Sequence, residues 1–329
     1  MEEKYIPPYE ITDEMLVLVA EIMENLGKLN IVNDLKKLPK LRKVSRMKSI
    51  HSSLAIENNT LSLEQVTDII EGKRVLGPHD DILAVKNANQ AYKQLEKINP
   101  YDISDLLKAH KFMMQGLVNE AGQIRTGQVG VYNEKGKVVH LAPPAEMVSG
   151  QLLGLFTWLK QSSANMLIKS CVFHYEFEFI HPFRDGNGRM GRLWQTALLA
   201  SWKPIFAWIP IESIIKDNQE EYYKAITYST SQGKSNIFIV FMLNCLNQAI
   251  KDIVQDTRNH INHITSQVSE LLKVIEDYPQ SATELMMKLK LKSRNNFRIN
   301  YLIPALEFGL IKMTLPNKPT SRNQRYFKA

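Results

Sequence analysis

The sequence predicts a mainly α-helical protein with one short β-hairpin and a small basic module at its C-terminal end. Apolar residues recur at three- and four-residue steps through most of the chain, which is the helical period. That period fails only between residues 121 and 144, where glycines alternate with valines. The ten Lys or Arg and two Glu after residue 279 give this end a charge of +8, against +7 for the whole chain. Net positive charge is therefore a property of the C-terminal module.

Length and composition set the class of protein. A chain of 329 residues exceeds the usual single core, so two or three domains are expected. The two cysteines, Cys171 and Cys245, lie in apolar stretches and are expected to be buried free thiols, which suits a reducing compartment. The N-terminus has no signal-peptide pattern, and no run approaches the ~20 apolar residues of a membrane span. We therefore expect a cytoplasmic protein with no membrane partner.

The N-terminal region predicts three helices. Apolar residues from Met15 to Leu26 follow the helical period and end near Gly27. A second helix is expected over residues 33–56, with Pro39 as a potential break. Ser62 followed by Gln65 forms a capping box, which predicts a third helix ending at Gly72.

The central region predicts helices on both sides of the hairpin. They are expected over residues 81–98, 104–117, 145–160, 167–179, 187–201, 218–230 and 237–264. Between 121 and 144 the alternation of glycine and valine predicts two short strands. No repeat is visible, which excludes a solenoid.

The C-terminal module predicts a winged helix-turn-helix. A capping box at Ser281 opens a helix to about Leu289, Ser293 opens a second, and short strands are expected at 313–316 and 325–327. DNA binding is one interpretation, with Arg294 and Arg298 on the recognition helix. Lys318 and Arg322 would then contact phosphates from the wing. The alternative is a module for protein contacts or dimerisation, so a homo-oligomer stays open.

The chemistry is concentrated in the segment from His181 to Arg192, His-Pro-Phe-Arg-Asp-Gly-Asn-Gly-Arg-Met-Gly-Arg. Its glycines have the G-x-G-x-x-G spacing of dinucleotide sites. Those sites need a strand before the first glycine, whereas a helical pattern precedes this segment and Pro182 discourages its continuation. The sequence therefore predicts a helix, a glycine-rich loop and a second helix, and a Rossmann site is rejected.

This arrangement predicts an anion site. The free N–H groups at the start of the second helix bind anions, and Gly186 and Gly188 let phosphate oxygens approach them. Arg189 and Arg192 lie on one face of that helix and neutralise phosphates. Asp185 is expected to hold magnesium on the phosphates. His181 is expected to be the general base for an attacking hydroxyl.

The segment closely resembles the motif of the Fic family, His-Pro-Phe-x-[Asp/Glu]-Gly-Asn-Gly-Arg-x-x-Arg. Every fixed position matches, and the resemblance runs from about Arg46 to Leu246. It implies a Fic helical core with a β-hairpin flap, and transfer of AMP from ATP to a protein hydroxyl. The resemblance implies that His181 is the general base and that Asp185 is the magnesium ligand. It also implies that Gly186, Asn187 and Gly188 form the phosphate loop, and that Arg189 and Arg192 bind the nucleotide phosphates.

Two further segments fit the resemblance. The hairpin from Gly122 to Pro144 stands where relatives have a flap that pairs with an extended stretch of the target, although a purely structural hairpin is the alternative. Tyr222 and Tyr223 stand where relatives form part of the adenine pocket, although tyrosines at helical positions are commonly core residues. Where some relatives carry a base-reading asparagine, this chain has residues 229–232, Ser-Thr-Ser-Gln.

An inhibitory segment is predicted upstream. Ser53 and Glu57 match the [Ser/Thr]-x-x-x-Glu-[Gly/Asn] signature of Fic proteins that carry their own inhibitory helix. Glu57 is expected to pair with Arg192 and so to compete with the γ-phosphate. A solvated glutamate at a helix end is the alternative.

The sequence thus predicts an autoinhibited adenylyltransferase that uses ATP with Mg²⁺ and modifies a Ser, Thr or Tyr hydroxyl of a target or of itself; removal of AMP is also open. The expected domains are an N-terminal helical region (1–78), a catalytic domain (79–265) and the winged-helix-like module (266–329). Two other hypotheses are a DNA-binding regulator that senses nucleotide without catalysis, and a metal hydrolase using His174, His181 and Asp185. The intact His181 and Asp185 favour a transferase over a sensor, and His174 lies on an apolar face.

Overall fold

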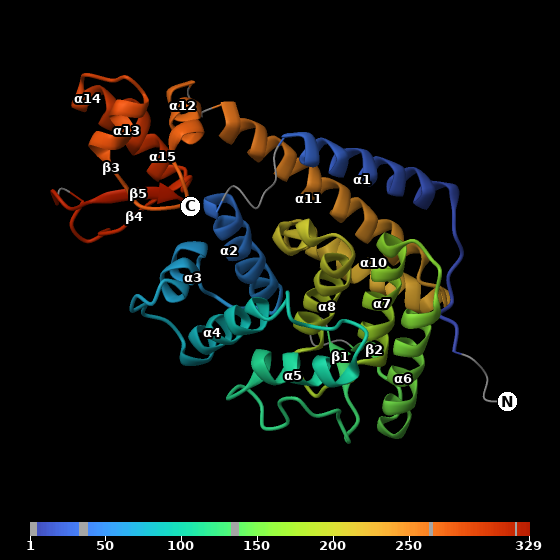
Figure 1. The fold of residues 1–329 in the computed structure, drawn as a ribbon. Coiled ribbons are helices and arrows are strands. Elements are labelled where there is room, and N and C mark those ends of the chain that lie inside the picture. Colours follow the sequence, from blue (N-terminus) through green and yellow to red (C-terminus); the bar gives the residue numbers. More distant parts are fainter. Residues whose placement is uncertain (1–4, 33–38, 133–137, 263–265, 320) are drawn as a thin grey trace. The chain divides into compact units, whose positions relative to one another are not determined.

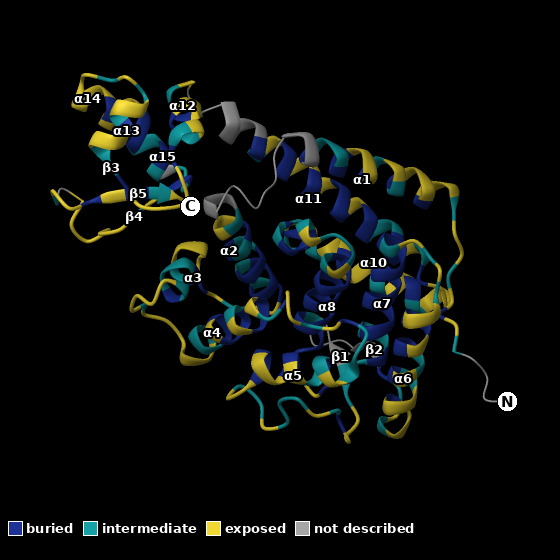
Figure 2. Ribbon diagram, in the orientation of Figure 1, coloured by how far each residue is buried: buried dark blue, intermediate teal, exposed yellow. Residues whose placement is uncertain are grey.

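Two antiparallel helices, α7 (Met166–Ile180) and α8 (Asn187–Trp202), carry the motif between them (Figure 1). The computed structural model describes residues 5–32, 39–132, 138–262, 266–319 and 321–329. Helix α7 is almost wholly buried because it is apolar on all sides, with Phe173 and Phe177 in its core. Trp194 of α8 is fully buried as well. The loop between these helices is therefore anchored at both ends in the interior (Figure 2).

The described chain divides into two compact units. One comprises Met1–Glu24 with Ser45–Ile250, and the other Asn25–Val44 with Lys251–Ala329. The domain boundaries expected after residues 78 and 265 stay predictions. The remaining helices up to residue 262 are α1 (Asp13–Val32), α2 (Pro39–Ile56), α3 (Leu63–Ile70), α4 (His79–Lys93), α5 (Ile103–Met114), α6 (Ala145–Gln161), a 3₁₀ helix (Pro204–Trp208), α9 (Ile211–Asp217), α10 (Gln219–Gln232) and α11 (Asn236–Asn262).

The mainly α prediction is confirmed, with differences at several boundaries. Helix α1 continues past Gly27 to Val32, and α2 begins at Pro39, where proline suits a first helical turn. The expected helical residues 33–38 and 263–264 lie outside the described residues. The capping box at Ser62 is present in full, since Ser62 accepts from the Gln65 N–H and Gln65 returns the bond. The segment 204–217 forms helices that the pattern did not predict.

The hairpin consists of β1 (Gly130–Tyr132) and β2 (Val138–Leu141), which pair antiparallel with an irregularity between Val131 and Tyr132. The loop at 133–137 lies outside the described residues. The expected hairpin is therefore present, with its strands confined to the middle of the segment.

The C-terminal unit contains a small sheet and short helices. Its elements are α12 (Ser266–Val274), β3 (Gln280–Ser281), α13 (Ala282–Lys288), α14 (Arg294–Asn296), a π-helical turn (Phe297–Leu302), α15 (Ile303–Glu307), β4 (Ile311–Met313) and β5 (Arg325–Lys328). The strands pair in the order β3-β5-β4. The capping box at Ser281 and the cap at Ser293 both form. Strand β4 begins and ends earlier than the expected 313–316.

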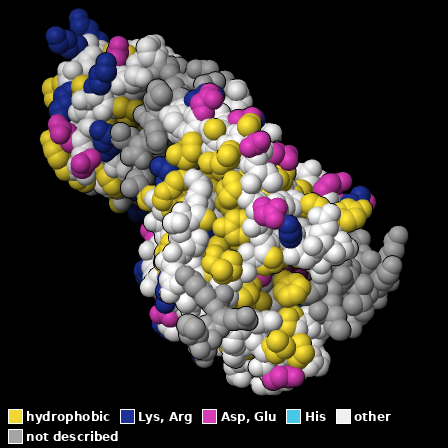
Figure 3. Space-filling model, turned by 90° about the vertical axis from the view of Figure 1, so that its right-hand side faces the viewer, with side chains coloured by type: hydrophobic (Ala, Val, Ile, Leu, Met, Phe, Trp, Pro, Cys, Tyr) yellow, Lys and Arg dark blue, Asp and Glu magenta, His cyan; other side chains and the backbone are white. Residues whose placement is uncertain are grey.

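Two features of the structure bear on contact with a membrane or with another protein. Helix α11 is long and apolar enough to cross a membrane over Asn236–Thr257, but 61% of that window is buried inside the protein, as in a core helix. Apolar side chains gather on the face shown in Figure 3, and exposed large apolar residues of the first unit include Leu16, Val17 and Leu153. Apolar surface of this kind often marks contact surfaces.

Candidate active site

His181 ends helix α7 in a left-handed conformation, with φ of 51°. Its N–H donates to the Phe177 carbonyl at 3.0 Å, and Pro182 then prevents another helical turn. The ring atom Nδ1 lies 3.3 Å from the Glu178 carbonyl oxygen. When Nδ1 donates its proton to that oxygen, Nε2 carries the lone pair that a general base needs. The main chain thus favours the tautomer suited to proton abstraction.

The loop after His181 is held by Asn187. Its amide nitrogen donates to the Phe183 carbonyl at 2.8 Å, and its amide oxygen accepts from the Phe183 N–H at 2.9 Å. Asn187 is buried, so these bonds fix the loop from inside the protein. Its side chain is committed to the loop, which leaves its main-chain N–H for the predicted phosphate contact.

His110 of α5 packs against the same loop and binds its main chain. Its ring stacks on Phe183, with centroids 3.6 Å apart, and its Nε2 donates to the Asp185 carbonyl at 3.0 Å. Nδ1 accepts from the Gly122 N–H at 2.8 Å, which fixes the neutral tautomer. Burial lowers the pKa of His110 to about 4, so it stays neutral at physiological pH. Nothing in the sequence pattern singled out this residue.

Helix α8 begins with an open first turn. Gly186 precedes it with φ of 83°, a conformation that favours glycine, and makes no side-chain cap hydrogen bond. The first N–H groups of α8 lack helical partners, and whether they form the anion cradle expected from the sequence stays a prediction; we call this first turn the anion cradle.

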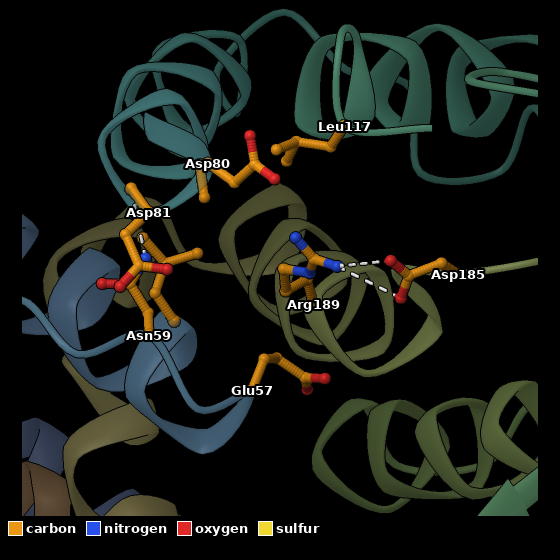
Figure 4. A pocket seen from close by; sticks show the side chains of 9 residues that line it. Glu57, Asn59, Asp80, Asp81, Leu117, Asp185 and Arg189 are labelled. Atoms are coloured by element: carbon orange, nitrogen blue, oxygen red, sulfur yellow. Dashed lines mark hydrogen bonds and ion pairs between the residues drawn. The ribbon is translucent and has the colours of Figure 1, made fainter. Parts of the chain in front are cut away.

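Asp185 and Arg189 lie at the mouth of this cradle. Arg189 Nη2 is 3.2 Å from Asp185 Oδ1, and the Asp185 side chain is 55% exposed. The Arg189 Nε is buried and has no hydrogen-bond partner among the described residues. An unsatisfied buried donor is costly, so this atom marks a place that an anionic oxygen would fill. Both residues line a pocket of about 210 Å³ together with Glu57, Asp80 and Asp81 (Figure 4).

Arg192 is the most buried charge of the site and is bound by helix α2. Its Nη2 donates to Glu57 Oε1 at 2.7 Å and to the Ser53 carbonyl at 2.9 Å, and its Nε donates to Ser53 Oγ at 3.1 Å. The Arg192 side chain is 1% exposed and that of Glu57 31%. Ser53 and Glu57 thus converge on Arg192, although they lie more than 130 residues away in the sequence.

The Glu57 carboxylate also lies over the cradle. A Cβ atom added to Gly188 would collide with Glu57 Oε1, which shows that the carboxylate sits against the first turn of α8. The Glu57 carboxylate is itself an anion, and it lies at the position where the sequence predicts that a bound anion would lie. Glu57 therefore lies against the cradle and at the same time forms an ion pair with Arg192.

Glu178 is a buried carboxylate next to this pair, and sequence reasoning did not predict it. Burial raises its pKa to about 8; the Arg192 charge opposes this rise and the Glu57 charge adds to it. Its Oε1 has no hydrogen-bond partner among the described residues and lies 3.8 Å from His174 Nε2. Burial therefore favours the protonated form of Glu178, which lies beside the Glu57–Arg192 ion pair.

The two predicted adenine-pocket tyrosines differ in position. Tyr222 is buried, and its hydroxyl lies 3.1 Å from His174 Nε2. Tyr223 is 36% exposed. The other ring nitrogen of His174 lies 2.6 Å from Gln195 Oε1, so His174 is a hydrogen-bonded packing residue. No group of three metal-ligating side chains is present among the described residues.

Helix, glycine-rich loop and helix together place a histidine beside the N-terminal turn of a buried helix. The Fic/DOC family matches residues 100–199, and the family described as "Filamentation induced by cAMP protein Fic-like, C-terminal domain" matches residues 266–327. The crystal structure of a Fic family protein from Desulfovibrio desulfuricans G20 is 45% identical, with a TM-score of 0.76. The match covers 99% of this chain and 98% of that one. The chain belongs to the Fic family.

Curated relatives are more distant. A Protein adenylyltransferase Fic from Nematostella vectensis is 28% identical over 63% of this chain and 48% of its own length. Protein adenylyltransferase fic-1 from Caenorhabditis briggsae is 30% identical over 54% of this chain and 35% of its own length. The chain thus spans half or less of the length of these relatives. Fic-1 (residues 134–508) from C. elegans, 21% identical with a TM-score of 0.61, shares the fold.

Proposed function

We propose that this protein is an autoinhibited protein adenylyltransferase, which transfers AMP from ATP to a Ser, Thr or Tyr hydroxyl of a target protein and to itself. The observation that carries the proposal is the placement of His181 and the anion cradle at the two ends of one rigid loop. The names of the curated relatives support the same activity. A nucleotide sensor has no need of a general base, which argues against the regulator hypothesis.

The reaction follows from these positions. The cradle and Arg189 hold the phosphates of ATP, so that the α-phosphate faces His181. The target hydroxyl attacks the α-phosphorus while His181 Nε2 takes its proton. The bond from the α-phosphorus to the bridging oxygen breaks, and pyrophosphate leaves with the electron pair. Arg189 stabilises the charge that develops on the phosphates.

Asp185 is the residue that would hold Mg²⁺. Its exposed carboxylate at the mouth of the cradle fits a cation that takes one or two carboxylates and otherwise phosphate oxygens and water. The ion would neutralise phosphate charge. Because Asp185 pairs with Arg189, binding of Mg–ATP would exchange that ion pair for contacts of Arg189 to phosphate oxygens and of Asp185 to the magnesium ion.

Autoinhibition is the finer part of the proposal. Glu57 takes the Arg192 donor that a γ-phosphate needs, so ATP binds in an unreactive pose until helix α2 moves. The same carboxylate, 31% exposed beside Gly188, is suited to orient a water molecule for removal of AMP. Transfer and removal would then share one site, and Glu57 would decide between them.

The target is proposed to dock on the hairpin. An extended segment that adds to the edge of β1 or β2 would present its hydroxyl next to His181. A cytoplasmic setting fits the free, buried Cys171 and Cys245.

The activity is tested with ATP labelled at the α-phosphate, added with the protein to cell lysate. We expect labelled proteins whose mass increase corresponds to AMP, and no such labelling by His181→Ala, which should still bind ATP. Label that appears equally with His181→Ala would refute the proposed transfer.

DNA binding by the C-terminal unit is a second proposal. Arg294 and Arg298 are exposed after the Ser293 cap, and Lys318 and Arg322 are exposed on the segment between β4 and β5. The sheet order β3-β5-β4 is compatible with a winged helix. Together these residues form a positive surface suited to phosphates.

This second proposal is tested on the whole chain with duplex DNA at several salt concentrations. Neutralising about four phosphates should give a log–log slope of affinity against salt of roughly −3.6. Arg294→Ala with Arg298→Ala should weaken binding and flatten that slope by about 2. Absence of binding at low salt would favour a module for protein contacts.

A further inference from the structure

Arg125 is a buried arginine whose side-chain hydrogen bonds all go to main-chain carbonyls among the described residues. It is 4% exposed and lies between α5 and the hairpin. Its Nε donates to the His181 carbonyl at 2.7 Å, its Nη1 to the Gly127 carbonyl at 3.0 Å, and its Nη2 to the Pro143 carbonyl at 2.6 Å. A buried guanidinium is expensive without partners, so these carbonyls replace its hydration.

The three carbonyls belong to three separate places. Gly127 precedes strand β1, and Pro143 follows strand β2, so they are the two feet of the hairpin. The His181 carbonyl belongs to the end of α7, where the Ile180 carbonyl also accepts from Nη2 at 3.3 Å. Carbonyls at a helix C-terminus lack helical partners and carry partial negative charge, which favours a cation there. The planar guanidinium therefore ties both feet of the hairpin to the catalytic loop.

The same residue stabilises a strained conformation. His181 has φ of 51°, a left-handed conformation that is strained for a residue with a Cβ. Such a conformation persists only where the surroundings determine it. Besides its side-chain bond to the His181 carbonyl, Arg125 donates its own N–H to the Pro182 carbonyl at 2.9 Å. Arg125 thus holds the peptide groups on both sides of the turn that aims the imidazole.

We propose that Arg125 is a positioning residue that keeps the general base His181 in register with the hairpin on which the target docks. It touches neither nucleotide nor target, and it acts through His181 and the hairpin. The inference rests on the proposed transferase activity. Because no hydrogen bond of Arg125 among the described residues goes to α8, its loss should affect transfer to protein far more than binding of ATP.

The test uses the whole chain with Glu57→Gly as background, so that transfer is measurable. Arg125→Lys keeps a positive charge, but one ammonium cannot reach all three places. Arg125→Gln is the second variant, because it removes the buried charge and keeps an amide donor. The matched control is Arg74→Lys, since Arg74 is an exposed arginine outside the motif. The probe is ATP labelled at the α-phosphate, and the readouts are labelling of the protein itself, release of free AMP by hydrolysis, and the Kd for ATP.

We expect both Arg125 variants to label protein at least ~10-fold more slowly than the control, because small displacements of reacting groups cost one to two orders of magnitude. Free AMP should fall less, since water needs no hairpin, and the Kd for ATP should change less than about 2-fold. Labelling at the rate of the control, or a parallel loss of all three readouts, would overturn the proposal. If the Glu57→Gly background itself transfers nothing, the proposed function fails instead.

Discussion

At the scale of the residue, the site depends on side chains whose hydrogen bonds go to the main chain. Asn187, His110 and Arg125 each bind backbone atoms of the motif loop. These contacts leave the half-buried His181 and the exposed Asp185 as the chemical groups of a loop that is otherwise fixed. Substitutions of these two groups should therefore alter chemistry without altering the loop.

Asp185 gives a direct prediction at this scale. Asp185→Ala should weaken binding of Mg–ATP and reduce the dependence of binding on magnesium, because it removes the carboxylate next to the phosphates. The measurement is a titration with ATP at several magnesium concentrations. The control is Asp80→Ala, which lies in the same pocket. A magnesium dependence identical to wild type would contradict the assignment of the ligand.

Glu176 predicts a pH dependence of stability. Burial raises its pKa to about 7, while its hydrogen bond from Tyr5 opposes the shift. Between its ordinary pKa of 4.5 and about 7 the folded protein binds a proton that the unfolded chain has released. The free energy of unfolding therefore falls across this window as pH rises, by at most about 1.4 kcal/mol per pH unit.

The variant Glu176→Gln removes that titration and keeps a side chain that can accept from Tyr5. Its Tm relative to wild type should rise as pH increases from about 4.5 to 7 and stay constant above. A Tm difference that does not change with pH would show that Glu176 titrates normally.

At the scale of the element, the proposed autoinhibition requires helix α2 to move before transfer occurs. It is anchored by Ser49, whose hydroxyl donates to Glu212 at 2.7 Å, and Glu212 also accepts from the Tyr92 hydroxyl at 2.7 Å. Gln219 of α10 donates to the Ile56 carbonyl at the end of α2 at 3.1 Å. These contacts hold α2 near its middle and at its C-terminal end, next to Glu57.

Ser49→Ala should loosen this helix. The lost hydrogen bond is worth about 1 kcal/mol, so transfer should rise about 5-fold through a larger open population. Self-labelling with ATP labelled at the α-phosphate measures it, and Ser231→Ala on the surface of α10 is the control. An unchanged rate would mean that α2 opens without breaking this contact.

The elements also show what sequence can predict. Helices with a clear apolar period or a capping box were predicted, such as α7 and the helix after Ser62. The segment 204–217 was not, because Pro204 and Pro210 divide it into pieces too short to show a period. In the site, the motif predicted where His181, Asp185 and the arginines lie. It could not reveal Arg125 or Glu178, because a bond to a distant carbonyl and a buried carboxyl leave no sequence pattern.

At the scale of the whole molecule, the account joins segments far apart in the chain into one regulated site. Helix α2 supplies Ser53 and Glu57, the loop between α7 and α8 carries His181, and the hairpin is the surface on which we propose that the target docks. The proposed autoinhibition depends on all of these parts, and it also requires that helix α2 can move away from Arg192.

The most direct test compares transfer from ATP labelled at the α-phosphate for wild type, Glu57→Gly and Glu57→Gly with His181→Ala. Arg192 is buried, so losing its pair with Glu57 should cost up to about 3–5 kcal/mol of stability, and the Tm of each variant is measured beside the labelling to show that it is folded. The account predicts a rise in labelling by one or more orders of magnitude for Glu57→Gly, and its loss in the double variant. Arg192→Ala should not reproduce the rise, because the arginine also seats the phosphates. Equal labelling by wild type and Glu57→Gly would contradict autoinhibition, and an active double variant would contradict His181 as the base.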